Sequence, residues 1–302
     1  RLGVDSLIPR LIEEALERHP HGIPVTGSRA LSLLEAVVEA QAELIARWMV
    51  VGFVHGVMNT DNTTISGQSI DYGPCAFIDS YNPEAVFSSI DTGGRYAYSR
   101  QPAIAQWNLT RLAETLLPQI DPDPGEAITL ATTALQTFES RYRSHYFRLL
   151  SAKLGIHAAP DDLVETLSED LLAIMAARSA DFTATFRALA QFLRDDEAPA
   201  AALIGSDPIT AAWLRRWRNA VTLGGLSDAD VATAMDAVNP LYIPRNHLVD
   251  EALVAAVDGD MTPFRTLLEV VTSPYVEREG AQRYAEPGSA AFAAGFRTFC
   301  GT

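Results

Sequence analysis

The sequence has a single lysine, Lys153, and only two cysteines, Cys75 and Cys300. Two cysteines exclude a disulfide framework and a four-cysteine zinc site, and they allow at most one bridge within the chain. The histidines show no HExxH motif or other paired spacing, which argues against a zinc site built on histidine. A GxxxxGK[ST] phosphate loop and a GxGxxG turn are also missing, so the sequence has no independent nucleotide-binding motif.

Long apolar runs and positive charge are scarce as well. No apolar run approaches the ~20 residues of a membrane-spanning helix, and the basic, apolar and small-residue order of a signal peptide is missing at the start. The 38 acidic residues outnumber the 23 basic ones, and the formal charge of −15 repels phosphate backbones and anionic lipids. We therefore expect a cytoplasmic protein that binds neither nucleic acid nor membranes. Frequent Arg and Ala with one Lys suggest a bacterial source, and a first residue that is not Met suggests a fragment.

Helical periodicity is the main pattern that the sequence does contain. An apolar content of 48% over 302 residues is sufficient for a large buried core. The spacing of apolar residues predicts a helix over 6–19, a second from an N-cap at Ser28 to Trp48, and a third after Pro102 that breaks from Pro118 to Gly125. Further helices are predicted along the ridge from Leu130 to Tyr146 and over 161–178, 180–195, 207–222 and 247–257.

The tryptophans and the lysine of these helices also carry predictions. Trp107, Trp213 and Trp217 lie at helical positions among apolar neighbours, which predicts that they pack in the core or between helices. Lys153 follows the ridge of the long helix and is predicted to be a solvated side chain on the helix face.

Residues 52–100 interrupt the helical pattern with Gly, Asn, Asp, Ser and Pro, which predicts a loop. The β-prone pieces Thr63–Ile65 and Ser69–Ile70 flank Gly67 and predict a small hairpin. Asp61 and Asn62 precede this hairpin, and Asp71 follows it. One carboxylate could face an acceptor hydroxyl, while the amide oxygen and the second carboxylate are hard ligands suited to Mg²⁺ carried in with nucleotide phosphates. On pattern alone, ordinary turns and Asx caps explain the same residues and are slightly favoured.

Two motifs in this segment resemble the catalytic loop and the metal-binding Asp-Phe-Gly of protein kinases: HGVMNTDN at 55–62 and IDYGP at 70–74. A protein kinase places its catalytic Asp five residues before the metal-binding Asn, where this chain has Val57, so an ordinary protein kinase is disfavoured. The two runs resemble the selenoprotein O family specifically. The match continues in order through Gly94-Arg95-Tyr96, the 101–109 stretch, Asn239-Pro240 with Tyr242, Arg245 and Asn246, Ser273-Pro274-Tyr275, and Tyr284 to Pro287.

The resemblance implies a kinase-like fold and an ATP-dependent enzyme that transfers AMP to Ser, Thr or Tyr hydroxyls of proteins. Carried over by position, Asp61 is the base, and Asn62 and Asp71 hold Mg²⁺, or Mn²⁺ in its place, so that Asp71 also contacts the bound nucleotide. The family's glycine-rich loop, phosphate-contacting lysine and partner glutamate all precede the residues matched here. We therefore expect a mainly α, kinase-like C-terminal lobe with a small β-hairpin at the catalytic loop, which is inactive alone.

The same resemblance divides the chain and gives its tail a role. Residues 1–120 are expected to form the catalytic lobe core, and residues 121–302 a helical extension that ends in a Cys-containing tail. Cys300 stands where the family carries a redox-active selenocysteine or cysteine, with Cys75 as the one possible partner within the chain. On residue type alone, Cys300 is equally compatible with a small apolar tail residue. Two other functions remain open: a non-catalytic lobe that binds a partner protein, and a kinase-like phosphotransferase.

Overall fold

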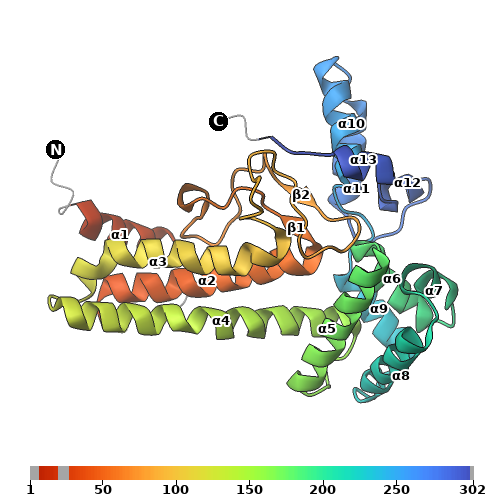
Figure 1. Cartoon of the computed structure of the whole chain (residues 1–302), viewed down its shortest axis with the longest axis horizontal. Coiled ribbons are helices and arrows are strands. Elements are labelled where there is room, and N and C mark those ends of the chain that lie inside the picture. Colours follow the sequence, from red (N-terminus) through yellow and green to blue (C-terminus); the bar gives the residue numbers. More distant parts are fainter. Residues whose placement is uncertain (1–6, 20–26, 300–302) are drawn as a thin grey trace.

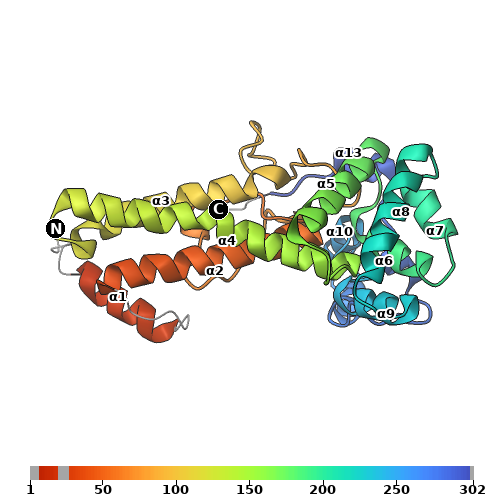
Figure 2. The same cartoon turned by 90° about the horizontal axis from the view of Figure 1, so that it is seen from below.

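The computed structural model of the protein describes residues 7–19 and 27–299. Its first half is built on four helices: α1 (Leu7–Arg18), α2 (Arg29–Val51), α3 (Gln101–Ile120) and α4 (Pro124–Leu154). In both views α2, α3 and α4 run side by side along the long axis of the molecule (Figures 1 and 2). The structure is mainly helical, as the sequence predicts.

Helix α2 forms where its local signals place it. The Ser28 hydroxyl accepts a hydrogen bond from the Leu31 backbone N–H at 3.2 Å, so it caps the first turn as predicted. Gly52 ends the helix in the left-handed conformation with φ 74°, which a residue without Cβ adopts without strain. Leu34, Val38 and Ile45 have no exposed surface, which confirms the predicted burial of this helix.

Helix α4 packs along α2 and α3 through small side chains. Ala127, Ala131 and Ala134 repeat at helical spacing and are buried, so the helix backbones can approach closely. Beyond them the predicted ridge continues as stacked rings, with Tyr142 6.3 Å from Phe138 and 5.6 Å from Tyr146 between ring centroids. Helix α4 lies beyond residue 120 and packs on α2 and α3. The division into residues 1–120 and 121–302 stays a prediction.

Five helices gather at the end of α4 (Figures 1 and 2): α5 (Asp161–Arg178), α6 (Phe182–Phe192), α7 (Ala198–Ile204), α8 (Pro208–Thr222) and α9 (Asp228–Val238). The indoles of Trp213 and Trp217 stack 5.7 Å apart in this region, and both are buried. Their N–H groups donate to the backbone oxygens of Leu167 and Leu154 at 2.9 and 2.8 Å. The predicted core role of these two tryptophans is confirmed.

Two polar residues, Arg245 and Asn246, connect the last helices to the rest of the structure. These helices are α10 (Asn246–Val257), α11 (Thr262–Val271), α12 (Gln282–Ala285) and α13 (Ala290–Gly295). Arg245 is fully buried, and its Nη1 lies 2.7 Å from carboxylate oxygens of both Asp79 and Asp181. The Asn246 side chain accepts from the Phe77 N–H at 3.2 Å and donates to its carbonyl oxygen at 2.7 Å. These contacts fix the C-terminal helices to the segment that follows Asp71-Tyr72-Gly73.

Three sequence predictions are wrong in their details. The strands are β1 (Phe53–Val54) and β2 (Ala76–Phe77), paired antiparallel, whereas the hairpin expected at 63–70 is a loop in which Thr64 binds the backbone of Gln68. Helix α3 runs through Pro118 to Ile120, because a proline in the last turn removes only one terminal hydrogen bond. Trp107 is 43% exposed rather than buried in the core.

Lys153 is the fourth correction, because it is buried rather than solvated. Only 4% of its surface is exposed, and its Nζ lies 4.0 Å from the centre of the Phe186 ring on α6. Burial lowers the pKa of Lys153 to about 7. A lysine covered in this way cannot reach a nucleotide phosphate.

Candidate functional site

The loop that carries the sequence motifs begins at His55, directly after β1. The His55 N–H donates to the Gln101 side chain at 3.0 Å, and Gln101 in turn donates to the Phe53 carbonyl oxygen at 2.9 Å. The imidazole Nε2 lies 2.8 Å from the Ile70 carbonyl oxygen, and burial lowers the pKa of His55. A buried, neutral His55 therefore joins the two ends of the loop and is not placed to take a proton from a substrate.

Gly56 allows the two motifs to approach each other at backbone distance. Its φ is 85°, and a Cβ at this position would lie 2.4 Å from the Pro74 carbonyl oxygen. Any other residue would force the loop away from Pro74, which directly follows Asp71-Tyr72-Gly73. The glycine of the first motif is thus required by the position of the second.

Asn62 and Asp71 are in contact, whereas Asp61 faces solvent. The Asn62 Nδ2 donates to the Asp71 Oδ2 at 2.9 Å and to the Val57 carbonyl oxygen at 3.1 Å. Asp61 lies in the middle of the 3₁₀ turn η2 (Thr60–Asn62), and this turn exposes its side chain. The two hydrogen bonds use the amide nitrogen of Asn62, so its oxygen remains as the ligand that this side chain can offer.

The backbone of Asp71 is strained. Its φ of 53° lies in the left-handed region, which costs a residue other than glycine about 1–2 kcal/mol. Such strain persists where the surrounding structure fixes the residue, and it is concentrated at functional sites. Here it aims the carboxylate at Asn62.

Side chains of α2 and α3 form hydrogen bonds with the loop, and the sequence patterns assigned no role to these side chains. Asn108 of α3 donates to the Met58 carbonyl oxygen at 3.0 Å and to the Thr63 hydroxyl at 2.9 Å. From α2, Gln41 donates to the Thr64 carbonyl oxygen at 2.6 Å, and the Trp48 indole donates to the Ser69 hydroxyl at 2.8 Å. An amide side chain on the apolar face of a predicted helix, such as Gln41, is the one sequence signal that could have predicted these hydrogen bonds to the loop.

The Gly94-Arg95-Tyr96 motif also reaches the loop. The Asp91 carboxylate accepts from the N–H groups of Arg95 and Tyr96 at 2.7 and 2.8 Å, which fixes the turn. The Tyr96 hydroxyl then donates to the Asn59 side chain at 2.7 Å. Arg95 is thereby placed beside the loop, with its guanidinium 4.8 Å from the centre of the Trp107 ring.

The end of the described chain lies beside the second motif. Thr298 forms a parallel bridge with Ser88, and its hydroxyl donates to the Pro74 carbonyl oxygen at 2.5 Å. Cys75, the next residue, is a free thiol whose pKa burial raises to about 11. Cys300 lies outside the described residues, so its pairing with Cys75 stays a prediction.

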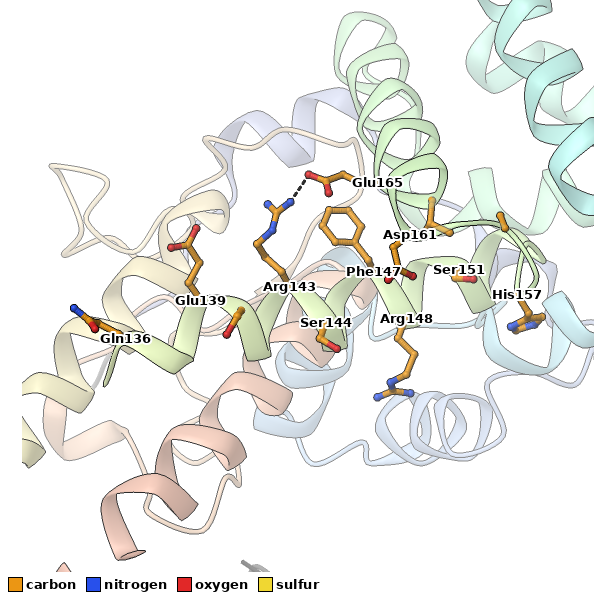
Figure 3. Close-up of a pocket in the computed structure, with 13 residues that line it drawn as sticks. Gln136, Glu139, Arg143, Ser144, Phe147, Arg148, Ser151, His157, Asp161 and Glu165 are labelled. Carbon is orange, nitrogen blue, oxygen red and sulfur yellow. Dashed lines mark hydrogen bonds and ion pairs between the residues drawn. The ribbon is translucent and has the colours of Figure 1, made fainter. Parts of the chain in front are cut away.

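A cavity lies between α4 and α5, away from these motifs. It has a volume of about 780 Å³, and Arg143 and Glu165 form an ion pair across it (Figure 3). None of its lining residues belongs to the loop of Asp61 or to the Asp71 motif. Its lining mixes acidic, basic and hydroxyl groups without a buried unpaired polar atom, so it offers no defined chemistry.

Comparison with known proteins settles the family. Residues 4–272 match the family model described as protein adenylyltransferase SelO. The chain belongs to this family. It is similar to the protein nucleotidyltransferase YdiU of Rhodococcus jostii (54% identical over 91% of this chain and 53% of the relative). It is also similar to that of Mycobacterium sp. strain KMS (53% identical over 99% of this chain and 60% of the relative).

The family assignment confirms the resemblance seen in the sequence, and it also limits what can be said of this chain. A match at 47% identity to the YdiU protein of Chromobacterium violaceum covers 99% of this chain and 63% of that relative. The chain thus spans about 60% of the length of the curated relatives. Among residues 7–19 and 27–299, no helix is long and apolar enough to cross a membrane.

Proposed function

We propose that the full-length protein transfers AMP from ATP to Ser, Thr or Tyr hydroxyls of proteins, and that Asp61, Asn62 and Asp71 form the catalytic centre. The observation that carries the proposal is the contact of Asn62 with Asp71, with Asp61 exposed directly before it. A base and a pair of oxygen ligands are the parts that transfer to a hydroxyl requires. The family membership of the chain supports the same reaction.

The order of elements supports a kinase-like C-terminal lobe. A long buried helix, α2, leads into β1, the loop with Asn62, the Asp71-Tyr72-Gly73 turn and then β2, which pairs back onto β1. This pairing closes the loop at its base and brings the two motifs to one end of the strand pair. We propose that the helices beyond residue 120 form the extension packed on this lobe.

The residues present fit a Mg²⁺ or Mn²⁺ ion that arrives with ATP. Asp71 and Asn62 offer one carboxylate and one amide oxygen, and Mg²⁺ commonly takes one or two carboxylates and completes its shell with phosphates and water. When bound, the ion would neutralise charge on the phosphates. Among the described residues, no group of three or more His, Cys, Asp or Glu side chains could hold a metal.

Asp61 would act on the acceptor. Its carboxylate would accept the proton of the hydroxyl as that oxygen bonds to the α-phosphorus of ATP and pyrophosphate leaves. An exposed position suits this role, because the acceptor belongs to another protein and must reach the carboxylate from solvent. The nucleotide contacts that the family places before the matched residues would come from the rest of the full-length protein.

The proposal is tested by giving the full-length protein ATP labelled at the α- or the γ-phosphate, with heat-denatured bacterial proteins as acceptors. Label transferred from the α-phosphate alone is the expected result. Label from the γ-phosphate would instead establish a kinase-like phosphotransferase. If neither label is transferred, while the protein folds, the lobe that binds a partner without catalysis becomes the better account.

We also propose that Cys300 is a redox-active tail cysteine and that Cys75 is its partner. Thr298 is bound to Pro74, so the tail reaches the residue before Cys75. A bridge requires the two Cα atoms to lie within about 7 Å. Non-reducing peptide mapping of the oxidised full-length protein should find a peptide linking Cys75 to Cys300; two free thiols would reject the pairing.

A further inference from the structure

A second cavity, of about 400 Å³, lies directly beside the Asp61 loop and has no role in the chemistry described so far. Thr60, Thr63, Thr64 and Ile65 line it from the loop, and α3 contributes the opposite wall. Thr60 adjoins Asp61 in the chain, whereas Asp71 is not among the lining residues. The cavity therefore opens next to the base and not onto the carboxylate that would face the nucleotide.

The wall from α3 is apolar, aromatic and cationic. Trp107 is 43% exposed, and the guanidinium groups of Arg95 and Arg111 lie 4.8 and 5.2 Å from its ring centre. The Arg111 Nε is buried and has no hydrogen-bond partner among the described residues, while its Nη2 pairs with Glu114 at 2.8 Å. The Arg111 side chain is 41% exposed and its guanidinium carries five N–H donors, so it can bind an acceptor from a ligand in addition to Glu114.

The charge of this wall contrasts with that of the whole chain. The chain carries a formal charge of −15, yet Arg111 lines this cavity beside the exposed Trp107 indole, and Arg95, which is not a lining residue, lies over the same ring. The Arg95 backbone is fixed by Asp91, so the arrangement is built into the fold. An apolar group beside a carboxylate would satisfy both the indole and the Arg111 guanidinium.

We propose that this cavity binds the acceptor protein, with an apolar side chain against Trp107 and a carboxylate paired with Arg111. The inference rests on the proposed AMP transfer and adds the class of acceptor sequence. An extended chain advances about 3.3 Å per residue, so a hydroxyl at Asp61 and side chains in the adjoining cavity belong to one short segment. The predicted acceptor site is therefore a Ser, Thr or Tyr within a few residues of an apolar residue and an Asp or Glu.

The test maps the sites that full-length wild type and variants modify in heat-denatured bacterial proteins, by mass spectrometry. Wild-type sites should be enriched in an acidic and an apolar residue at fixed positions. Arg111→Glu should lose the acidic preference and favour Lys or Arg there, and the preference should change by about fivefold, the size of an exposed ion pair. Trp107→Ala should lose the apolar preference. The affinity for Mg²⁺·ATP should stay unchanged in both variants.

Controls separate the possible outcomes. Arg215→Glu, on an exposed position of α8, makes the same charge change away from the cavity and should keep the wild-type site preference. Thermal unfolding of each variant verifies that it is folded. Unchanged site preference in both cavity variants overturns the inference, as does a loss of ATP affinity, which would make the cavity a nucleotide site. If wild type modifies no protein at all, the proposed function itself fails.

Discussion

Asn62 donates a hydrogen bond from its Nδ2 atom to the Asp71 Oδ2 atom over 2.9 Å, across nine residues of chain. The contact exists although Asp71 has an unfavourable φ of 53°. The interactions that impose it come from the fold: Gly56 against Pro74, and His55 against Ile70. The two proposed ligands are thus held in place by the fold itself, which would lower the entropic cost of binding a nucleotide.

Removal of the Asp71 carboxylate should abolish metal-dependent nucleotide binding. In the full-length protein, Asp71→Ala leaves one neutral ligand for the cation and no negative charge to offset it. Calorimetry with ATP in the presence and absence of Mg²⁺ should show that the metal no longer strengthens binding. Asp250→Ala, on an exposed position of α10, is the matched control and should bind as wild type does. Equal Mg²⁺·ATP affinity in Asp71→Ala and wild type would contradict the assignment.

The strain at Asp71 predicts an inverted order of stability between glycine and alanine. At φ 53° glycine is unstrained, so Asp71→Gly should be more stable than Asp71→Ala by about 1 kcal/mol. At Glu169, exposed within α5, the order should be the reverse, with Glu169→Ala more stable by about 1 kcal/mol. Urea unfolding of the four variants measures both differences. The same order at both positions would show that Asp71 is not held in this conformation.

Buried Lys153 should make stability depend on pH. Its pKa falls from 10.5 to about 7 on folding, because burial disfavours the charged form. Between about pH 7 and pH 10.5 the unfolded chain then binds more protons, so the free energy of unfolding rises with pH and this contribution is lost as the pH falls towards 7.

The lysine's contribution is isolated by substitution. Lys153→Met keeps the apolar stem, so it should be more stable than the parent near pH 7, by an amount that shrinks towards pH 10.5. Arg215→Met on the exposed face of α8 should show no such trend. Unfolding midpoints across this range provide the measurement. A constant difference between Lys153→Met and the parent would show that Lys153 stays charged, held by the ring of Phe186.

How much of the fold the sequence predicts depends on how local each signal is. The start and end of α2 follow from Ser28 and Gly52, which act within one turn of the helix. Strands β1 and β2 have two residues each and stand far apart in the chain, so neither shows the alternation over 4–8 residues that identifies a strand. The sequence therefore does not predict this pairing, and the β-prone residues beside Gly67 predict a hairpin where the structure has a loop.

The same distinction applies to single residues. The helical spacing of Trp107 and Trp217 predicts packing for both, yet α3 exposes the first beside Arg95 and α8 buries the second. Lys153 is buried by Phe186, which lies on a different helix. The motif resemblance places Asn62 and Asp71 in one site and includes the stretch with Gln101 and Asn108, but the hydrogen bonds of these two amides to the loop depend on how the loop packs on α3.

The chain of 302 residues alone should fold and remain inactive. Its core is continuous from α1 to α9, which is sufficient for a stable structure. Transfer from ATP depends mostly on positioning and electrostatics, and this chain spans about 60% of its relatives. Circular dichroism should show a cooperative helical unfolding transition, while α-labelled ATP should label no protein. Labelling comparable to that by the full-length protein would show that the nucleotide contacts lie within these residues.

The central claim, that Asp61 is the base of a centre whose nucleotide ligands are Asn62 and Asp71, is tested most directly by Asp61→Ala in the full-length protein. Single-turnover transfer of AMP from α-labelled ATP and calorimetric Mg²⁺·ATP binding are measured on the same preparation. The account predicts affinity within about twofold of wild type, and a transfer rate lower by ~10²–10⁴-fold, the usual contribution of a general base. A collapse of ATP binding with an unchanged rate at saturation would contradict it, because Asp61 would then be a nucleotide ligand.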